Sequence, residues 1–367
     1  MDNLVLYRKY RPQNFSEIIG QEHIVQTLTN SINSNSISHA YLFSGSRGSG
    51  KTTIARIFAK AVNCESKGNF KPCDKCASCI EIVSSKSMDL IEIDAASHTG
   101  VDDVRDLIDG IKFAPIKSKY KIFIIDECHQ LSKSASNALL KTLEEPPGHA
   151  IFILATTEAH KMIPTIVSRC QRFDFRRLQV PEIIKKLEFI SKKENILFEP
   201  SALSLIALNA RGSFRDAESL LDKCISFSGK TNLIKTEEIK ELLGIVEVSQ
   251  ISQFIDYILS KSTKEAILYL NSLVETGVDL QEFTKTLIFY LRQSLLLKIN
   301  PDLLNIQTSG LSEEEIEKMK AQTAKLTEKD IQKMLELFIE AENKMKYAII
   351  LQLPLELAVI DITYSPD

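Results

Sequence analysis

The chain has 367 residues, a length that allows two or three domains of roughly 100–200 residues each. Hydrophobic residues make up 44% of the chain and charged residues 25%, and the formal net charge is −3. This charge excludes a strongly basic nucleic-acid binder, so any bound DNA needs local patches of positive charge or several subunits. Residues 1–12 are polar and basic, unlike a secretory signal, and no apolar run approaches the ~18 residues that span a bilayer, so we expect a cytoplasmic protein without a membrane partner.

The first half of the chain alternates short apolar, β-branched runs with helical patterns. The predicted strands cover residues 40–44, 90–94, 121–126 and 150–156, and the predicted helices cover 52–62, 102–111 and 134–143. Continuous apolar runs are typical of parallel strands, because helices cover both faces of such a sheet. The alternation therefore predicts a doubly wound α/β domain, which we place at residues 1–178.

After Phe175 the pattern becomes helical, and no convincing strand follows. Short helices are predicted at residues 181–193, 201–209, 215–227 and 236–243. Longer amphipathic helices are predicted at 249–259, 263–274, 280–297, 312–326 and 327–344. The sequence thus predicts a small helical domain at residues 179–243 and a second all-α domain at residues 244–367.

A glycine-rich segment between the first predicted strand and the first predicted helix fits the phosphate-binding pattern G-x-x-x-x-G-K-[ST]. Its residues are Gly45, Ser46, Arg47, Gly48, Ser49, Gly50, Lys51 and Thr52. In this context backbone N–H groups and the helix N-terminus bind phosphates, Lys51 neutralises the β- and γ-phosphates, and Thr52 holds Mg²⁺. The alternative, a glycine-rich turn with a stray lysine, leaves the flanking strand and helix unexplained. The segment therefore predicts binding of ATP and Mg²⁺.

Two carboxylates follow the apolar run of the third predicted strand. A parallel strand delivers its last residues to the edge where the P-loop lies, so Asp126 can order the Mg²⁺ shell and Glu127 can polarise the attacking water. An ordinary acidic strand end is the alternative. The run Asp126-Glu127-Cys128-His129 superficially resembles a helicase motif, but we expect His129 to cap or couple rather than to catalyse. Thr157 follows the predicted strand at residues 150–156, and we expect its side chain to lie between the γ-phosphate and the attacking water.

Four of the seven cysteines cluster within residues 62–82, as C-x8-C-x2-C-x2-C. They are Cys64, Cys73, Cys76 and Cys79. Four thiolates can close a tetrahedral Zn²⁺ site with no open position, which makes the zinc structural. An iron–sulfur cluster is the alternative, because ferredoxins use similar spacing. Cys128, Cys170 and Cys224 are expected to be buried thiols, since cytosolic cysteines stay reduced.

Together these segments resemble one family, the γ/τ subunits of bacterial DNA polymerase III, which are clamp-loader ATPases of the AAA+ class. The resemblance rests on residues 7–12 (YRKYRP), 19–22 (IGQE), 40–45 (AYLFSG), 91–97 (IEIDAAS), 137–147 (NALLKTLEEPP) and 154–157 (LATT), and on the cysteine cluster directly after the P-loop helix. It is dense over the first ~230 residues and thin afterwards. It implies an AAA+ α/β domain with a zinc knuckle, then a helical lid and an all-α collar.

The resemblance also implies roles for individual residues. The adenine-side segment corresponds to Tyr10, Arg11 and Pro12. Thr157 corresponds to the sensor-1 residue, and Arg215 to the sensor-2 arginine on the lid, which contacts the nucleotide of its own subunit. Arg169, in the run Ser168-Arg169-Cys170, corresponds to the arginine that reaches the γ-phosphate of the neighbouring subunit. Taken alone, either arginine would be interpreted as a surface salt bridge.

The function that the resemblance implies is a motor. ATP binding at subunit interfaces assembles a spiral that opens a ring-shaped sliding clamp, and primed DNA triggers hydrolysis and clamp release. The implied partners are delta- and delta-prime-type subunits and copies of this chain in a hetero-pentameric ring, the beta clamp and primed-template DNA. Two other functions stay open: a scaffold subunit that binds ATP with little hydrolysis, against which Lys51, Glu127 and Arg169 argue, and a helicase or branch-migration motor, whose other signatures are missing.

Two features depart from the family pattern. Residues 98–103 (HTGVDD) carry no Lys or Arg, whereas some relatives have basic residues there for DNA, which weakens an assignment of DNA contacts to this loop. Longer family members continue beyond the collar to bind polymerase and helicase, and the 367 residues hold no such segment.

Overall fold

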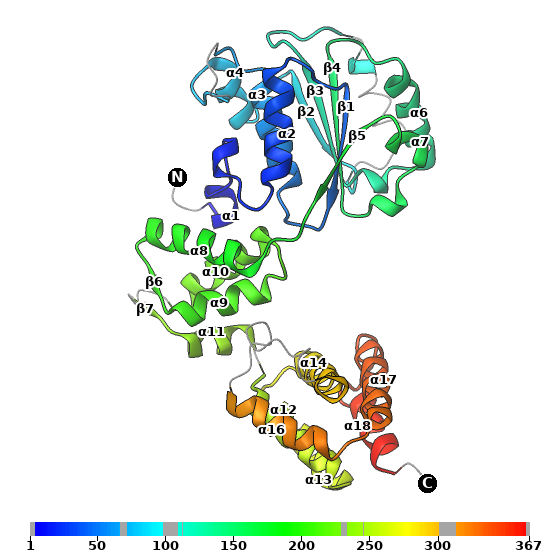
Figure 1. The fold of residues 1–367 in the computed structure, drawn as a ribbon. Helices are drawn as coiled ribbons and strands as arrows, with labels where there is room; N and C mark the ends of the chain where they lie inside the picture. Colours follow the sequence, from blue (N-terminus) through cyan, green and yellow to red (C-terminus); the bar gives the residue numbers. More distant parts are fainter. Residues whose placement is uncertain are drawn as a thin grey trace. The chain divides into compact units, whose positions relative to one another are not determined.

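The structure is a computed structural model that describes residues 4–66, 72–97, 109–111, 113–228, 233–244, 246–300 and 313–364 (Figure 1). The chain forms two compact units, Met1–Thr236 and Glu237–Asp367. The predicted division into three domains stays a prediction, because the chain separates at one point, between Thr236 and Glu237. The loop at residues 98–103 and most of the predicted helix at 102–111 lie outside the described residues.

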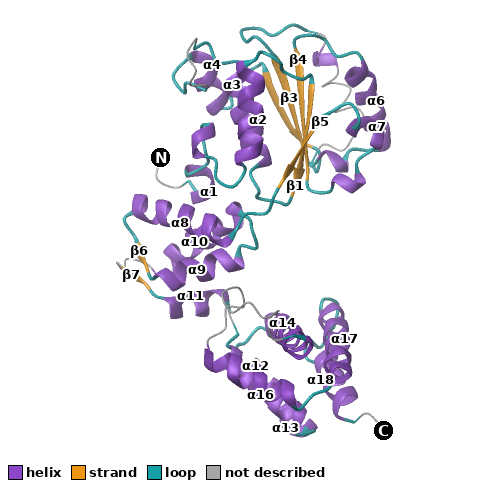
Figure 2. Cartoon of the chain, viewed as in Figure 1, coloured by secondary structure: helices purple, strands orange, loops and turns teal. Residues whose placement is uncertain are grey.

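A five-stranded parallel sheet forms the centre of the first unit (Figure 2). Its strands are β1 (Ala40–Gly45), β2 (Leu90–Asp94), β3 (Lys121–Asp126), β4 (Ala150–Thr156) and β5 (Gln171–Phe175), in the order β2-β3-β4-β1-β5. Each neighbouring pair is parallel. The predicted parallel sheet is therefore confirmed, and the four predicted strands agree with β1 to β4.

β5 was not predicted, because it lacks a continuous apolar run. Only Phe173 and Phe175 are buried in this strand, and the three residues between and before them are exposed. The strand pairs with β1 alone, at the edge of the sheet. An edge strand needs fewer apolar residues than the strands buried at the centre.

Helices cover both faces of the sheet (Figure 1). On one face lie α2 (Glu22–Asn33) and α3 (Lys51–Val62), and on the other lie α6 (Lys133–Glu144) and α7 (Pro164–Val167). The side chains of β1 alternate between these layers: Tyr41 and Phe43 pack in the first, and Ala40 and Leu42 in the second. Because all five strands are parallel, the residues that follow β1, β3 and β4 meet at one edge.

Short helical segments complete this part of the first unit. They are α1 (Leu6–Lys9), η1 (Phe15–Glu17), α4 (Ala77–Val83), η2 (Cys128–Gln130) and η3 (Ala159–Lys161). η2 and η3 directly follow the residues that end β3 and β4, so they lie beside the edge just described.

A helical bundle follows β5 within the first unit. It holds α8 (Val180–Glu194), α9 (Pro200–Asn209), α10 (Phe214–Ser228) and two paired strands of two residues each, β6 (Leu197–Phe198) and β7 (Leu233–Ile234). The predicted helices are confirmed here, whereas the two short strands were not expected. The fully buried Gln21, which precedes α2, donates through Nε2 to the backbone oxygen of Arg176 at 2.8 Å and so holds the segment that joins β5 to the bundle.

In the second unit, the described residues form helices and no strand, in agreement with the predicted all-α domain. Its helices are α12 (Val248–Leu259), α13 (Thr263–Glu275), α14 (Leu280–Ile299), α16 (Glu313–Ala324), α17 (Glu328–Met345) and α18 (Leu353–Thr363), and α11 (Thr236–Leu243) begins at the boundary between the units. Three buried rings mark its core: the centroid of Phe254 lies 5.4 Å from that of Phe283 and 6.2 Å from that of Phe338.

Among the described helices, none is by itself long and apolar enough to cross a membrane. The pair α11 and α12, bent by 56° at the break between them, meets the requirement by length and composition alone.

Candidate functional site

The P-loop leads from β1 into α3, which begins at Lys51. Gly50 precedes the helix in the left-handed region, with φ 102°. Gly48 also has a positive φ, 73°, and a Cβ at this position would lie 2.0 Å from Ser213 Oγ on the bundle. Only glycine fits there, because a side chain would collide with Ser213 and strain the backbone. The loop therefore lies against the start of α10, whose Phe214 N–H donates to the Gly48 oxygen at 3.2 Å.

Lys51 points back into the P-loop. Its ammonium donates to the backbone oxygens of Gly45 at 2.7 Å and of Ser46 at 3.0 Å. Burial lowers the pKa of Lys51, and the carboxylates of Glu127 and Asp126 oppose this shift. An ammonium has three donors, so one donor is left for a phosphate oxygen.

Thr52 and Asp126 meet across the sheet edge. The Thr52 hydroxyl donates to Asp126 Oδ2 at 2.6 Å, and Asp126 Oδ1 accepts from the backbone N–H of Glu127 at 3.0 Å. A hydroxyl and a carboxylate side by side are the oxygen ligands that Mg²⁺ takes in nucleotide sites. The two residues predicted for Mg²⁺ are therefore brought together.

Glu127 and Thr157 are also brought together. Glu127 Oε2 accepts from the Thr157 hydroxyl at 2.8 Å and from its backbone N–H at 3.2 Å. Glu127 itself has a left-handed backbone, with φ 47° and ψ 41°. This conformation is unfavourable for a residue with a side chain, and such strain clusters at active sites, where the surrounding structure holds it.

These residues line one cavity of about 1200 Å³. Arg47 to Thr52, Asp126, Glu127 and Thr157 lie on its wall, together with Arg11, Pro12 and Arg215. Arg11 Nε donates to Thr53 Oγ1 at 3.1 Å, and burial lowers the pKa of Arg11 to about 10. The guanidinium carbon of Arg215 lies 5.0 Å from the centre of the Tyr7 ring. Nine of the residues predicted to form the P-loop or to act in hydrolysis thus line the same cavity.

Three predicted residues lie off this wall. Gly45 and Ser46 take part through the backbone oxygens that hold Lys51. Tyr10 turns away: its hydroxyl donates to Glu194 Oε1, and burial raises the pKa of Tyr10 to about 12. Its predicted role beside adenine therefore has no support in the geometry of the described residues.

Arg169 also lies outside the cavity wall, as expected of a residue that acts on a neighbouring site. Its Nη2 lies 2.6 Å from Glu144 Oε1, and its Nη1 donates to the Thr165 oxygen at 2.8 Å. About a third of its side chain is exposed, so the guanidinium is held at the surface by groups from α6 and α7.

A buried charged pair on the cavity wall was missed by the sequence analysis. Lys186 Nζ, on α8, donates to the backbone oxygen of Tyr10 at 3.0 Å, and only 5% of the surface of Glu218, on α10, is exposed. Burial raises the pKa of Glu218 to about 7, although the charge of Lys186 opposes the shift. Such a pair leaves no sequence signal, because its members lie on different helices at positions that helical patterns leave free.

The four clustered cysteines converge. The Sγ atoms of Cys64, Cys73, Cys76 and Cys79 all lie within 4.8 Å of one another. Four sulfurs that each lie about 2.3 Å from one zinc are about 3.8 Å apart, so a small contraction suffices. An iron–sulfur cluster spreads its thiolates over several irons and needs wider spacing. Residues 67–71 of the predicted knuckle lie outside the described residues.

The surroundings shift the thiol pKa values of the cluster in opposite directions, because burial raises the pKa of Cys64 and of Cys79. The backbone N–H groups of Lys75 and Cys76 lower the pKa of Cys73 to about 6. Lys60 of α3, almost fully buried, lies 2.5 Å from Asp74 Oδ1 and so ties the cluster to the P-loop helix. Asp74 thus links the cluster to the helix that follows the P-loop.

Three family models match consecutive parts of the chain. The model for the DNA polymerase III delta subunit matches residues 20–179, and the model for the ATPase lid domain of the DNA polymerase III clamp loader subunit matches residues 182–230. The model for domain III of DNA polymerase III subunits gamma and tau matches residues 234–367.

Relatives with known names match along most of the chain. DNA polymerase III subunit tau of Bacillus subtilis is 43% identical over 99% of this chain and 63% of its own length, and that of Escherichia coli is 42% identical over 82% and 46%. DNA polymerase III subunit gamma of Buchnera aphidicola from Schizaphis graminum is 39% identical over 96% and 98%. The chain thus spans less than two thirds of the length of the tau subunits.

The chain also matches a solved structure of RuvB, the Holliday junction branch migration motor of Thermotoga maritima. The match covers 74% of this chain and 86% of the RuvB chain, with 19% sequence identity and a TM-score of 0.49. At this similarity the likeness says nothing about activity.

The buried carboxyl of Glu218 predicts a pH-dependent stability. Its pKa of about 7 lies above the ordinary value of 4.5, so the folded chain holds this proton more tightly than the unfolded chain. The bound proton of Glu218 therefore contributes to the free energy of unfolding below pH 4.5, and this contribution is lost as the pH rises through 7. Glu218→Gln removes the charge, so at pH 8 we expect the variant to be more stable than the wild type by up to about 3 kcal/mol, and by less as the pH falls.

Thermal unfolding at pH 5.5, 7 and 8 measures this effect. The control is Glu188→Gln, since Glu188 is exposed on the neighbouring helix α8. Equal melting temperatures of Glu218→Gln and the wild type at all three pH values would contradict the prediction.

Proposed function

The chain belongs to the family of DNA polymerase III gamma and tau subunits, and from this premise we propose that it is an ATPase motor subunit of a clamp loader. ATP binding and hydrolysis by this chain drive the opening of a ring-shaped sliding clamp and its loading onto primed DNA. The observation that carries the proposal is the pairing of Glu127 with Thr157 beside the pair of Thr52 and Asp126 in one cavity. A subunit that only binds ATP needs Thr52 and Asp126 for Mg²⁺, but it does not need Glu127 and Thr157.

Each residue of the cavity has a role in hydrolysis. Lys51 and the N-terminus of α3 hold the phosphates. Thr52 and Asp126 would hold Mg²⁺, which would neutralise charge that develops on the phosphates. Glu127 takes up the proton of the attacking water, while Thr157 keeps its carboxylate oriented. Arg215 reaches the nucleotide from the bundle, which thereby acts as a lid.

Arg169 acts in trans. It lies off the cavity of its own chain, and a third of its side chain is exposed, so the guanidinium that Glu144 and Thr165 hold at the surface can face a neighbouring subunit. There it stabilises negative charge on the transferred phosphate, as an arginine finger does. Each ATP site is then complete only between two subunits, which couples hydrolysis to the state of the ring.

The partners of the chain are delta- and delta-prime-type subunits and further copies of itself in a hetero-pentameric ring, together with the beta clamp and primed-template DNA. Because the formal charge of this chain is −3, the positive field for DNA comes from the ring as a whole. A replication role places the protein in the bacterial cytoplasm.

The helix α18 of the second unit offers a surface for ring assembly. Its residues Leu355 and Val359 are fully buried, yet Leu353, Leu357 and Ile360, at helical spacing on another face, are 38–50% exposed. A helix that is apolar on both faces is expected to be covered on both. We assign the exposed face to contacts with the neighbouring subunits of the ring.

The four clustered cysteines bind a structural Zn²⁺. Their convergence within 4.8 Å and the ion pair of Asp74 with Lys60 support a closed site that stiffens the outer end of α3. The zinc has no open position and takes no part in hydrolysis.

The trans role of Arg169 predicts a loss of turnover without a loss of binding. In a complex assembled with its partner subunits, Arg169→Ala should bind ATP as the wild type does, because the side chain lies off its own cavity. Clamp- and DNA-stimulated turnover should fall by about 10³-fold. The matched control is Arg172→Ala, which removes an exposed arginine paired only with Asp174 in the same strand. Full stimulation of Arg169→Ala would rule out the trans role.

The zinc proposal predicts about one zinc per purified chain. Replacing Cys73 and Cys76 together by serine should remove the metal and lower the melting temperature, because two of the four ligands are lost. The control, Cys224→Ser, changes a buried thiol far from the cluster and should keep the zinc. Elemental analysis decides: iron with visible absorbance, or no metal at all, would contradict a zinc site.

A further inference from the structure

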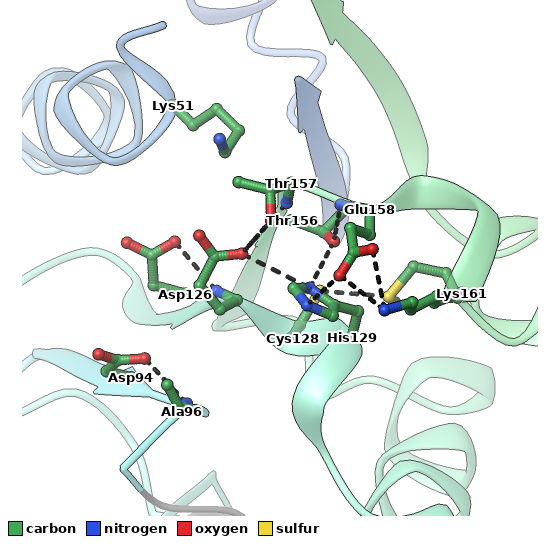
Figure 3. Close-up of polar contacts among 12 residues, drawn as sticks. Lys51, Asp94, Ala96, Asp126, Cys128, His129, Thr156, Thr157, Glu158 and Lys161 are labelled. Carbon is green, nitrogen blue, oxygen red and sulfur yellow. Dashed lines mark hydrogen bonds and ion pairs between the residues drawn. The ribbon is translucent and has the colours of Figure 1, made fainter. Parts of the chain in front are cut away.

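His129 lies two residues after Glu127, and its side chain is nearly buried, with 7% of its surface exposed. Its two ring nitrogens face different partners (Figure 3). Nδ1 lies 3.0 Å from Thr156 Oγ1 and 3.5 Å from Glu127 Oε2, whereas Nε2 lies 3.0 Å from Glu158 Oε2. The imidazole therefore bridges the segment that follows β3 and the segment that follows β4.

Both ring nitrogens of His129 face oxygen atoms at the end of β4. The hydrogen bond of Glu158 to Lys161 lowers the pKa of the Glu158 carboxyl and keeps it ionised, so this carboxylate accepts from Nε2–H. Thr156 Oγ1 accepts from the backbone N–H of Glu158 at 3.0 Å, and its hydroxyl can meet Nδ1 as a donor or as an acceptor. In either case His129 bonds to both Thr156 and Glu158.

The network ends on the residue that orients Glu127. Thr157 holds the Glu127 carboxylate through its hydroxyl and its backbone N–H, and it lies between Thr156 and Glu158, the two residues that His129 holds. His129 Nδ1 lies 3.5 Å from Glu127 Oε2, so the closer partner of the Glu127 carboxylate is the Thr157 hydroxyl, at 2.8 Å. Thr157 thus orients the Glu127 carboxylate. Glu127 has a left-handed backbone, which needs support from the surrounding residues.

We propose that His129 is a positioning residue for ATP hydrolysis: by holding Thr156 through Nδ1 and Glu158 through Nε2, it fixes the end of β4 and with it the Thr157 that orients the Glu127 carboxylate. The inference rests on the proposed function, because it needs Glu127 to act in hydrolysis. Neither Lys51 nor the P-loop backbone belongs to this network, so His129 acts on turnover and leaves nucleotide binding unchanged.

Two substitutions of His129 separate its hydrogen bonds from its packing. His129→Phe keeps a ring but removes both bonds, and it should lower kcat by about 10- to 100-fold with the Kd for ATP unchanged. His129→Asn places an amide near the position of Nδ1, so it keeps a bond to Thr156 and should recover part of the lost turnover. The control is His23→Phe, which alters an exposed histidine on α2 outside this network and should match the wild type.

A third variant covers the case in which a substitution of the buried histidine fails to fold. Glu158→Gln weakens the anchor of Nε2 from a partly exposed position, and it should lower kcat with the Kd for ATP unchanged. The inference is overturned if a folded His129→Phe turns over as the wild type does, if His129→Asn is no better than His129→Phe, or if the Kd weakens as much as kcat falls. Wild-type turnover by Glu158→Gln would also overturn it.

Glu127→Gln, measured in the same complexes, separates this inference from the proposed function. If Glu127→Gln keeps full turnover, the proposed function fails and the inference fails with it. If Glu127→Gln abolishes turnover while His129→Phe leaves it intact, only the inference fails.

Discussion

The hydrogen bond between Thr52 and Asp126 joins the two halves of the nucleotide site. Thr52 lies in the first turn of α3, which follows β1, and Asp126 ends β3, with β4 between β1 and β3 in the sheet. The contact exists because the strands are parallel and deliver their last residues to one edge. The apolar cores on both faces of the sheet hold that edge in place, so a slip of one strand would separate the Mg²⁺ ligands and move Glu127 away from Thr157.

Under the proposed trans role of Arg169, one chain is an incomplete enzyme. The P-loop, the carboxylates and the lid arginine Arg215 surround one cavity, whereas Arg169 is held at the surface by Glu144. A positive charge that must reach a neighbour's phosphate cannot also face its own site. Under this account the ring, with subunits joined through surfaces such as the exposed face of α18, is the unit that hydrolyses ATP.

The sequence was sufficient where residues act through local patterns. The runs that form β1 to β4, the P-loop and the cysteine spacing all lie in continuous segments, so pattern and spacing reveal them. β5 was missed because an edge strand has no continuous apolar run. The contacts of His129 with Glu158 and the pair of Lys186 and Glu218 were missed for a different reason: they join residues about 30 positions apart, and only folding sets which way such side chains point.

Steady-state ATP turnover of the chain, assembled with delta- and delta-prime-type subunits, tests the motor account most directly. Turnover would be compared without additions, with the sliding clamp, with primed-template DNA, and with both together. The account predicts a large stimulation that needs clamp and primed DNA at the same time, because each ATP site is completed only in the closed spiral. A low rate that neither addition changes, in complexes of the correct composition, would contradict it and leave an ATP-binding scaffold as the better description.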